Sequence, residues 1–186
     1  MSRPTFIETD RLELCPPDED DIDFLREGVN HPRVREHIAV FREPYTEARY
    51  RDELWDVDAD SPTLLAIPKT GEHAGGPVGS VQLHPVNETD GYANFGTWFH
   101  PDAWGNGYAT EAAAHLIDYG FADLRIHRIS ASVMAGNDAS RRLCERLGFV
   151  HEGTTREAWF ASGDYRDVER YGLLENEYAG VNAVLD

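Results

Sequence analysis

The sequence predicts one α+β domain in which helices flank a central mixed sheet. Two helical patterns come early, a meander of strands follows, and a strand–helix–strand unit precedes a final hairpin. The 186 residues are 41% hydrophobic, enough for a single domain with a sizeable core. We expect this domain to span residues 1–178 and the tail 179–186 to be frayed, because chain ends are poorly ordered unless they are tied down.

The first third of the chain alternates strand and helix signals. Alternating hydrophobic residues predict a first strand over 6–14. Acidic residues 18–21 supply a cap and first-turn charges for a helix that ends before Pro32, because proline disfavours helical backbone in the preceding residue. A short helical piece is expected over 34–40, and a longer helix, capped by its first residue, over 46–58.

The rest of the chain predicts a meander, a crossover helix and a hairpin. Glycine-rich turns separate the first strands of this part. One helix is expected from the glycine turn at 105–107 to Phe121, and a second over 139–147, ended by Gly148. The strands are expected over 63–67, 78–83, 92–99 and 128–133, from 149 onward, and over 164–174.

Composition disfavours several classes of protein. No apolar run approaches the roughly 20 residues that a membrane helix needs. Residues 1–5 lack the apolar core of a signal peptide, so we expect a soluble, cytoplasmic protein that binds no membrane. Cys15 and Cys144 are too few for a disulfide scaffold and form no metal-ligand cluster, so we expect no bound metal.

The net charge is strongly negative. It is −17, from 34 acidic and 17 basic residues. A surface of this charge repels nucleic acid and anionic lipid, so we expect neither as a partner. Two explanations stay open, a halophilic adaptation in which carboxylates keep the acidic surface hydrated, and attraction of a cationic substrate. The spread of acidic residues along the whole chain favours the first.

Residues 104–112 (WGNGYATEA) form the most informative segment of the chain. A glycine-rich turn between a strand and a helix leaves backbone N–H groups unpaired near the positive end of the helix dipole, where phosphate binds readily. Glycine also allows a positive φ and close approach of a ligand. A Walker loop is excluded because no Lys-Ser/Thr follows, and the glycine spacing fits a Rossmann fingerprint poorly. The segment therefore predicts a diphosphate site for a large cofactor.

Further motifs accompany this segment at specific spacings. Together with residues 137–140 and 147–149, it resembles the GNAT superfamily of N-acetyltransferases, while 163–167 and 171–174 resemble its RimJ/RimL branch. The resemblance extends from residue 9 over essentially the whole chain. It implies acetyl-CoA as cosubstrate and a primary amine as acceptor, either a protein N-terminus or a small molecule. A homodimer is plausible only by family habit.

The resemblance also implies where the cosubstrate lies. GNAT proteins splay two central parallel strands, here 92–99 and 128–133, and the exposed main chain pairs with the pantetheine arm like an added strand. The asparagine at 137 would bond the pantetheine region, and the serine at 140 begins the helix beside it. The expected cofactor-binding residues are Phe99, Trp104, Gly105, Asn106, Gly107, Tyr108, Ala109, Thr110, Asn137 and Ser140.

Three of the residues around the loop also have simpler explanations. Trp104 stands where many GNAT members carry Gln or Arg, and we expect it to be a hydrophobic anchor that leaves phosphate binding to backbone amides. Asn137 taken alone is a candidate helix cap. Glu111 lies in the first turn of its helix, where a carboxylate interacts favourably with the helix dipole.

The expected reaction is attack of a neutral amine on the thioester carbonyl. A backbone N–H near Phe99 would stabilise the oxyanion. Where many GNAT enzymes have a tyrosine acid this chain has Cys144, a residue type that is usually inert packing when buried. RimL-like enzymes suggest Ser140 instead, and a carboxylate in the following strand. At the matching position this chain has Trp159, and Glu157, two residues earlier, is the candidate base. The other titratable groups near the central strands are His84 and His100.

The acceptor pocket is expected between the early helices and the last hairpin. Aromatic side chains there are candidates to line it, although aromatic stripes are often core. The candidates are Phe41, Tyr45, Trp159, Phe160 and Tyr165. Two further functions stay open, a non-catalytic acyl-CoA-binding module and an acyltransferase that uses a different acyl-CoA.

Overall fold

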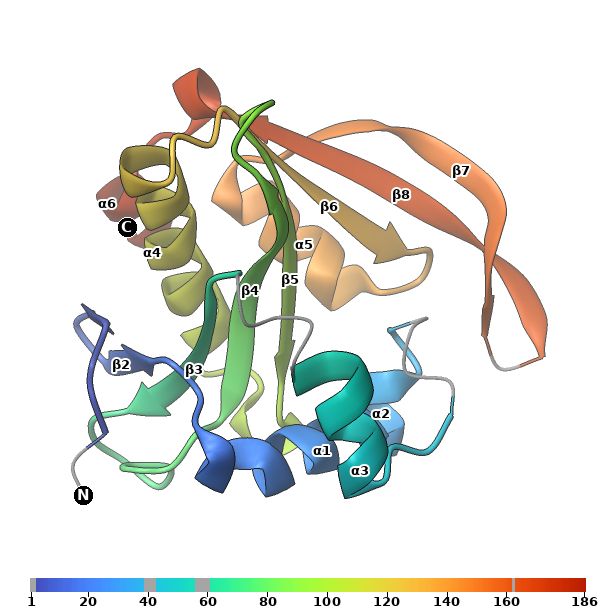
Figure 1. The fold of residues 1–186 in the computed structure, drawn as a ribbon. Coiled ribbons are helices and arrows are strands. Elements are labelled where there is room, and N and C mark those ends of the chain that lie inside the picture. Colours follow the sequence, from blue (N-terminus) through green and yellow to red (C-terminus); the bar gives the residue numbers. More distant parts are fainter. Residues whose placement is uncertain (1–2, 39–42, 56–60, 162) are drawn as a thin grey trace.

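One eight-stranded sheet organises the structure (Figure 1). The computed structural model describes residues 3–38, 43–55, 61–161 and 163–186. The strand order is β1-β2-β3-β4-β5-β6-β8-β7, with β5 and β6 parallel and the other neighbours antiparallel. The strands are β1 (Ile7–Glu8), β2 (Leu12–Cys15), β3 (Thr63–Pro68), β4 (Gly79–Asn87), β5 (Tyr92–Phe99), β6 (Arg128–Met134), β7 (Val150–Ala161) and β8 (Asp164–Leu174). The predicted mixed, mostly antiparallel sheet is confirmed.

Helices cover the sheet on both faces (Figure 1). The α-helices are α1 (Ile22–Asn30), α2 (Pro32–Arg35), α3 (Glu47–Tyr50), α4 (Tyr108–Asp123), α5 (Asp138–Leu147) and α6 (Val181–Leu185). Helix α4 packs on β2, β4 and β5 beside α5 and α6. On β3, Leu64 and Ala66 belong to the large core under α4, while Leu65 belongs to a smaller core under α1 and α3. Side chains alternate along a strand, so these two cores lie on opposite faces.

The N-terminal segments differ from their predicted bounds for local reasons. The expected strand over 6–14 is a hairpin, because the Thr9 amide donates to the Leu12 carbonyl and reverses the chain. Helix α2 starts earlier than expected because the His31 side chain caps it by accepting a hydrogen bond from the Arg33 amide. Thr46 caps α3 as predicted, and the segment continues as a π-helical turn, Arg51–Trp55. The expected ends of these two helices, 39–40 and 56–58, lie outside the described residues.

The parallel strands β5 and β6 part from each other. They pair only at their first three residues, from Tyr92 opposite Arg128 to Asn94 opposite Ser130. Beyond these pairs the two strands diverge, as Figure 1 shows, while β6 stays paired with β8. The predicted splayed pair is therefore present, and it opens a gap in the middle of the sheet.

The C-terminal tail is ordered, so the expectation of a frayed segment over 179–186 is wrong. A positive φ at Gly180 turns the chain into α6, and the Val184 side chain is buried against the core. Arg146 of α5 donates from Nε to the Val184 carbonyl at 3.2 Å. The Tyr178 hydroxyl donates to the Ala114 carbonyl at 2.7 Å. These contacts tie the end of the chain to α4 and α5.

Within the described residues, no helix is both long and apolar enough to cross a membrane.

Candidate active site

The glycine turn leads into a helix whose N-terminus has no side-chain cap. Gly105 and Gly107 have φ values of +81° and +78°, a conformation that residues with a Cβ rarely adopt. Gly107 is the N-cap of α4, so no side chain satisfies the first amides of this helix, those of Tyr108, Ala109 and Thr110. The turn thus presents several N–H donors at the positive end of a helix dipole.

A cavity of about 470 Å³, the loop cavity, lies against this turn. It extends between the end of β5, the first turn of α4, α2 and α5. All the residues predicted to bind the cofactor line it except Asn106, whose side-chain amide turns back to the Ala103 carbonyl at 3.0 Å. The lining residues among the predicted set are Phe99, Trp104, Gly105, Gly107, Tyr108, Ala109, Thr110, Asn137 and Ser140.

The loop cavity is positively charged although the chain is strongly acidic. Arg33, Arg142 and Arg146 line it, and no carboxylate does so among the residues that the structure describes. Arg142 and Arg146 are four residues apart on α5 and therefore share one helix face. None of these arginines was among the predicted site residues, although the spacing of Arg142 and Arg146 on a helix beside the expected cofactor arm was a usable signal. The cavity is suited to an anion by both its amides and its side chains.

Trp104 is held differently from the prediction. Its side chain is 42% exposed, so it is not a buried hydrophobic anchor. Its indole Nε1 donates to the Phe99 carbonyl at 2.7 Å, and the Arg33 guanidinium lies 4.6 Å from the ring centroid. A hydrogen bond and a cation–π contact therefore hold this ring at the surface.

Asn137 and Ser140 lie where the loop cavity meets a second cavity. Asn137 is the N-cap of α5, and its side-chain oxygen accepts from the Ser140 amide at 3.1 Å. The simpler reading of Asn137 is therefore correct. The cap uses only the oxygen, and within the described chain the side-chain NH₂ has no hydrogen-bond partner, so it can donate to a ligand.

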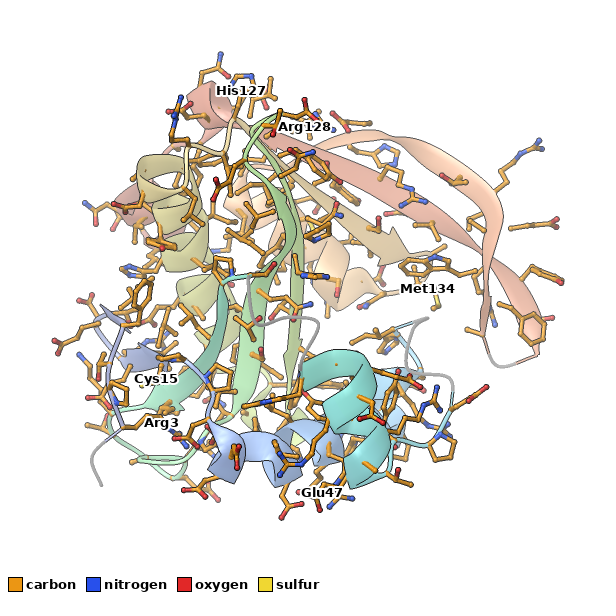
Figure 2. All side chains as sticks on the ribbon, viewed as in Figure 1. Arg3, Cys15, Glu47, His127, Arg128 and Met134 are labelled. Atoms are coloured by element: carbon orange, nitrogen blue, oxygen red, sulfur yellow. The ribbon has the colours of Figure 1, made fainter. Side chains whose placement is uncertain are left out.

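The second cavity, the large cavity, has a volume of about 760 Å³. Its walls come from α1, the π-helical turn, strands β3 to β6, α5 and β7, and they include Met134 at the end of β6 (Figure 2). The two cavities adjoin each other, because they share seven lining residues. The residues that line both are His37, Ile38, Thr97, Trp98, Asn137, Ser140 and Leu143.

One edge of the large cavity carries polar side chains from a single strand. Ser80, Gln82 and His84 alternate along β4 and face the cavity together. The His84 Nδ1 atom lies 3.0 Å from the Ser61 hydroxyl. The Thr63 hydroxyl, beside them on β3, is buried without a partner in the described chain. His100, the other histidine singled out, lines neither cavity; its ring accepts from the Asp102 amide at 3.4 Å.

The three catalytic candidates lie in different places relative to the two cavities. Ser140 lines both cavities, and Cys144 lines the large one. Cys144 is only 3% exposed, and burial raises the pKa of its thiol to about 12. Glu157 lines neither cavity, because a bulge between Thr155 and Trp159 interrupts the alternation on β7. Its φ is +51° and its amide donates to the Asp167 carboxylate, which leaves the Glu157 side chain in solvent.

The predicted acceptor-pocket residues are largely elsewhere. Trp159 lines the large cavity. Tyr45 does not, because it is buried in the small core with Arg49 stacked on its ring at 4.6 Å. Tyr165 is exposed near the tip of the β7–β8 hairpin, where its ring centroid lies 5.1 Å from that of Phe160, and neither residue lines the loop cavity or the large cavity. Phe41 lies outside the described residues.

Known proteins match the chain over most of its length. The family described as acetyltransferase (GNAT) domain matches residues 11–150. The chain belongs to the GNAT acetyltransferase family. The uncharacterized N-acetyltransferase p20 of Bacillus licheniformis is 30% identical over 178 residues, which are 92% of this chain and 97% of p20. The putative ribosomal N-acetyltransferase YdaF of Bacillus subtilis is 33% identical over 102 residues, 55% of this chain and 56% of YdaF.

A solved GNAT structure supports the same fold. The spermidine N-acetyltransferase of Vibrio cholerae, in complex with CoA and spermine, superposes with a TM-score of 0.79 at 26% identity, covering 91% of this chain and 99% of that one. This chain is thus an acetyl-CoA-dependent N-acetyltransferase. Its residues fit the cosubstrate, because uncapped amides, three arginines and an open strand gap line connected cavities.

Proposed function

We propose that the loop cavity holds acetyl-CoA and that the large cavity receives the acceptor amine. The connection between the two cavities carries this proposal. They share Thr97 and Trp98 of β5 and Asn137 and Ser140 of α5, which flank the gap between the diverging strands. A thioester in this gap is reached by the cosubstrate from one side and by an amine from the other.

The diphosphate is assigned to the amides of Gly105 and of residues 107–110, together with Arg142 and Arg146. Charge-assisted bonds from guanidinium groups add to the uncapped N–H donors of α4. The pantetheine arm is assigned to the main chain of β5 near Phe99 and to the free NH₂ of Asn137. Part of this edge is already used, since the Phe99 carbonyl accepts from the Trp104 indole.

The acetyl thioester supplies an activated acyl group. Attack by the amine nitrogen forms an amide bond to the carbonyl carbon, breaks the carbon–sulfur bond and releases CoA as a thiolate. Ser140 is positioned to donate a hydrogen bond to that sulfur, because it lines both cavities. The raised pKa of the buried Cys144 thiol, about 12, argues against Cys144 as the acid, because protonating a thiolate whose conjugate thiol has a pKa of about 8.5 would be uphill.

The proton that the amine loses is assigned to His84. Imidazole is the side chain suited to general-base work near neutral pH. His84 stands on a strand and is held by Ser61, which fixes its position at the large cavity. His37 also lines this cavity, but it lies in a turn after α2 and pairs with Glu36 at 3.5 Å. It therefore serves as the matched comparison for His84.

The acceptor is proposed to be the terminal amine of a peptide or of another largely apolar molecule. Tyr50, Trp55, Trp98 and Trp159 line the large cavity. Among the described lining residues Glu53 is the single carboxylate, and it is bound by Arg49 at 2.8 Å. A polyamine such as spermine, which binds the similar Vibrio cholerae enzyme, carries several charges that these walls do not match.

A thiol-release assay tests the proposed function. The chain is offered acetyl-CoA with peptides that have free N-termini, with amino acids, polyamines and aminoglycosides. We expect CoA release with at least one primary amine and the highest kcat/KM with a peptide. Binding of acetyl-CoA without transfer to any amine would overturn the catalytic proposal in favour of a binding module. Polyamines as the best substrates would overturn the acceptor class alone.

We also propose a cytoplasmic, salt-adapted protein, supported by the use of acetyl-CoA and by 34 acidic residues against 17 basic ones. A melting curve measured against KCl tests this, since a salt-adapted chain gains stability up to molar salt. Maximal stability at low salt would contradict it. The homodimer and the absence of nucleic acid and membrane partners stay predictions, which sedimentation and binding assays check.

A further inference from the structure

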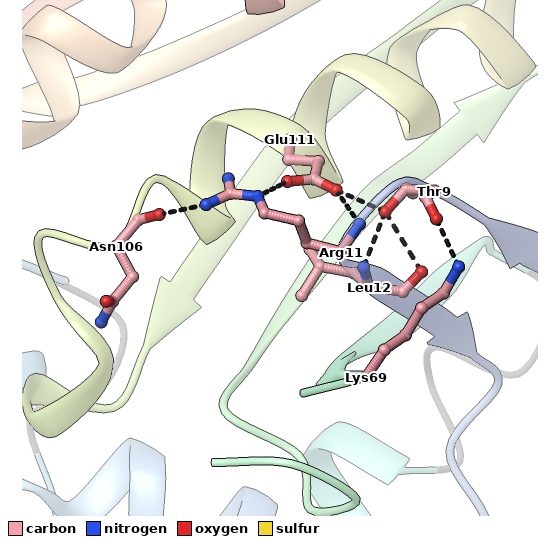
Figure 3. A network of polar contacts seen from close by, with 6 residues as sticks. All are labelled: Thr9, Arg11, Leu12, Lys69, Asn106 and Glu111. Carbon is pink, nitrogen blue, oxygen red and sulfur yellow. Dashed lines mark hydrogen bonds and ion pairs between the residues drawn. The ribbon is translucent and has the colours of Figure 1, made fainter. Parts of the chain in front are cut away.

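Glu111 is a buried charge close to the cofactor loop, and the proposed reaction does not use it. Glu111 is only 2% exposed. The expected interaction with the helix dipole does not explain this burial, because a carboxylate can make it at the surface. Its carboxylate accepts from the Thr9 hydroxyl at 2.6 Å, from the Arg11 amide at 2.8 Å and from Arg11 Nε at 2.6 Å. These donors come from the β1–β2 turn, about a hundred residues away in the sequence (Figure 3).

The hydrogen bonds keep Glu111 ionised. Burial by itself raises the pKa of Glu111, but the bonds from Thr9 and Arg11 outweigh it and hold the pKa below its usual value. Removing one partner of such a pair leaves a buried charge unpaired, which is strongly unfavourable. Glu111 therefore holds the Arg11 side chain in one place.

Arg11 continues from Glu111 to the glycine turn. Its Nη1 donates to the Asn106 carbonyl at 2.8 Å, which Figure 3 shows as the far end of the network. Its guanidinium carbon lies 5.4 Å from the Tyr108 ring centroid, and Nη2 lies 3.3 Å from the position of a Cβ at Gly107. One guanidinium thus bridges the first turn of α4 and the loop before it.

The bond to Asn106 orients the peptide unit between Asn106 and Gly107. In a trans peptide the C=O and N–H point in opposite directions, so a carbonyl fixed toward Arg11 directs the Gly107 N–H away from Arg11. Gly107 lines the loop cavity, whereas Arg11 does not. Without such a support, two glycines with positive φ are the most conformationally free part of the loop.

We propose that the Thr9–Arg11–Glu111 network is a positioning device that pre-organises the loop amides for the diphosphate of acetyl-CoA. Arg11 acts from behind the loop and is not itself a phosphate ligand, because its charge is neutralised by Glu111. This inference rests on the proposed function of the loop cavity. Pre-organisation improves affinity by removing the cost of ordering the loop on binding.

The test compares two thioesters in the full-length chain. Acetyl-CoA needs the loop, whereas S-acetylpantetheine lacks the diphosphate and does not. For Arg11→Met we expect the KM and Kd for acetyl-CoA to rise about tenfold, with kcat within about twofold. The KM for S-acetylpantetheine should stay at the wild-type value. Arg11 is 51% exposed, so this variant removes little core, and Arg11→Lys, which keeps the charge but cannot bridge both partners, should give an intermediate KM.

Glu152→Gln is the matched control. Glu152 and Arg128 form another side-chain ion pair and line neither cavity, so this variant should bind acetyl-CoA like the wild type. An unchanged KM in Arg11→Met, or an equal rise for both thioesters, overturns the inference while the proposed function stands. Failure of the wild type to bind acetyl-CoA overturns the proposed function and this inference with it.

Discussion

The two cavities are built from different parts of the chain. The loop cavity is lined by the glycine turn, the first turn of α4, the end of β5, α2 and one face of α5, while the large cavity is lined by α1, the π-helical turn, strands β3 to β6, α5 and β7. The donor site therefore depends largely on main-chain geometry, to which Arg142 and Arg146 add side-chain charge. The acceptor site depends on side chains that can vary independently. Acyl-donor use and acceptor choice should consequently respond to different kinds of mutation.

The largest expected effect comes from the backbone of the loop. In the double variant Gly105→Val, Gly107→Val, each new side chain is strained at a positive φ by about 1–3 kcal/mol. We expect kcat/KM for acetyl-CoA to fall about 100-fold, from the loss of well-placed amides. Gly71→Val is the control, because Gly71 has a φ of +89° and open space around it but lies outside both cavities. Equal losses in the two proteins would show that general strain explains the effect.

A smaller effect is expected from the acceptor side. His84→Asn should lower kcat about 30-fold near pH 7, since a general base contributes about 10²-fold or more when it is fully needed. The loss should shrink near pH 9, because an α-amine with a pKa of about 7.7–8.0 is then already neutral. His37→Asn should keep kcat within about threefold. A pH–rate profile of the three proteins checks this, and an equal effect of the two substitutions would remove the assignment to His84.

Replacement of Cys144 tests whether this residue contributes to stability or to catalysis. Its thiol ionises near pH 9.0 in the unfolded chain and near 12 in the folded one, so the unfolded state loses its proton first. The stabilisation of the folded state by the protonated Cys144 thiol is complete below pH 9 and is lost as pH rises toward 12. Between about pH 8 and pH 10, urea unfolding should show that wild type loses about 1 kcal/mol more than Cys144→Ala. The variant should keep its kcat, and a large fall in kcat would restore Cys144 as an acid.

The smallest effect is expected from the C-terminal helix. Val184→Ala removes two buried methyl groups and should lower the free energy of unfolding by about 1–2 kcal/mol. Because Arg146 donates to the Val184 carbonyl and lines the loop cavity, the KM for acetyl-CoA should rise about twofold, with no change in acceptor preference. Denaturation curves and KM values for both substrates measure this. A change in acceptor preference alone would contradict the division between the two cavities.

The features predicted well are those that depend on neighbours in the sequence. The strands before the glycine turn, the turn itself and α4 follow from local patterns. The positive φ of the turn glycines follows from residue type, because glycine adopts this conformation more readily than other residues. The splayed strands came from the family resemblance and not from local patterns. The caps at Thr46 and Asn137 are equally local, since a cap contacts amides two or three residues away.

The features that were missed depend on contacts between distant segments. Nothing near Glu111 in the sequence indicates that its partner is Arg11. The bulge that turns Glu157 into solvent depends on Asp167 in the neighbouring strand. Tyr45 and Trp159 are both aromatic, but only three-dimensional packing places one in a core and the other at a cavity. Side-chain burial is set by tertiary structure and cannot be derived from residue type alone.

The divergence of β5 from β6 has a consequence for solvent access to the protein interior. Peptide groups that point into the gap have no strand partner there, so their deuterium uptake should be fast for central strands of a sheet. Occupation of the gap by a pantetheine arm would slow this uptake at β5 and β6 and leave β1 to β3 unchanged. Mass-spectrometric exchange, measured with CoA analogues of different length, would then report how far each analogue reaches between the strands.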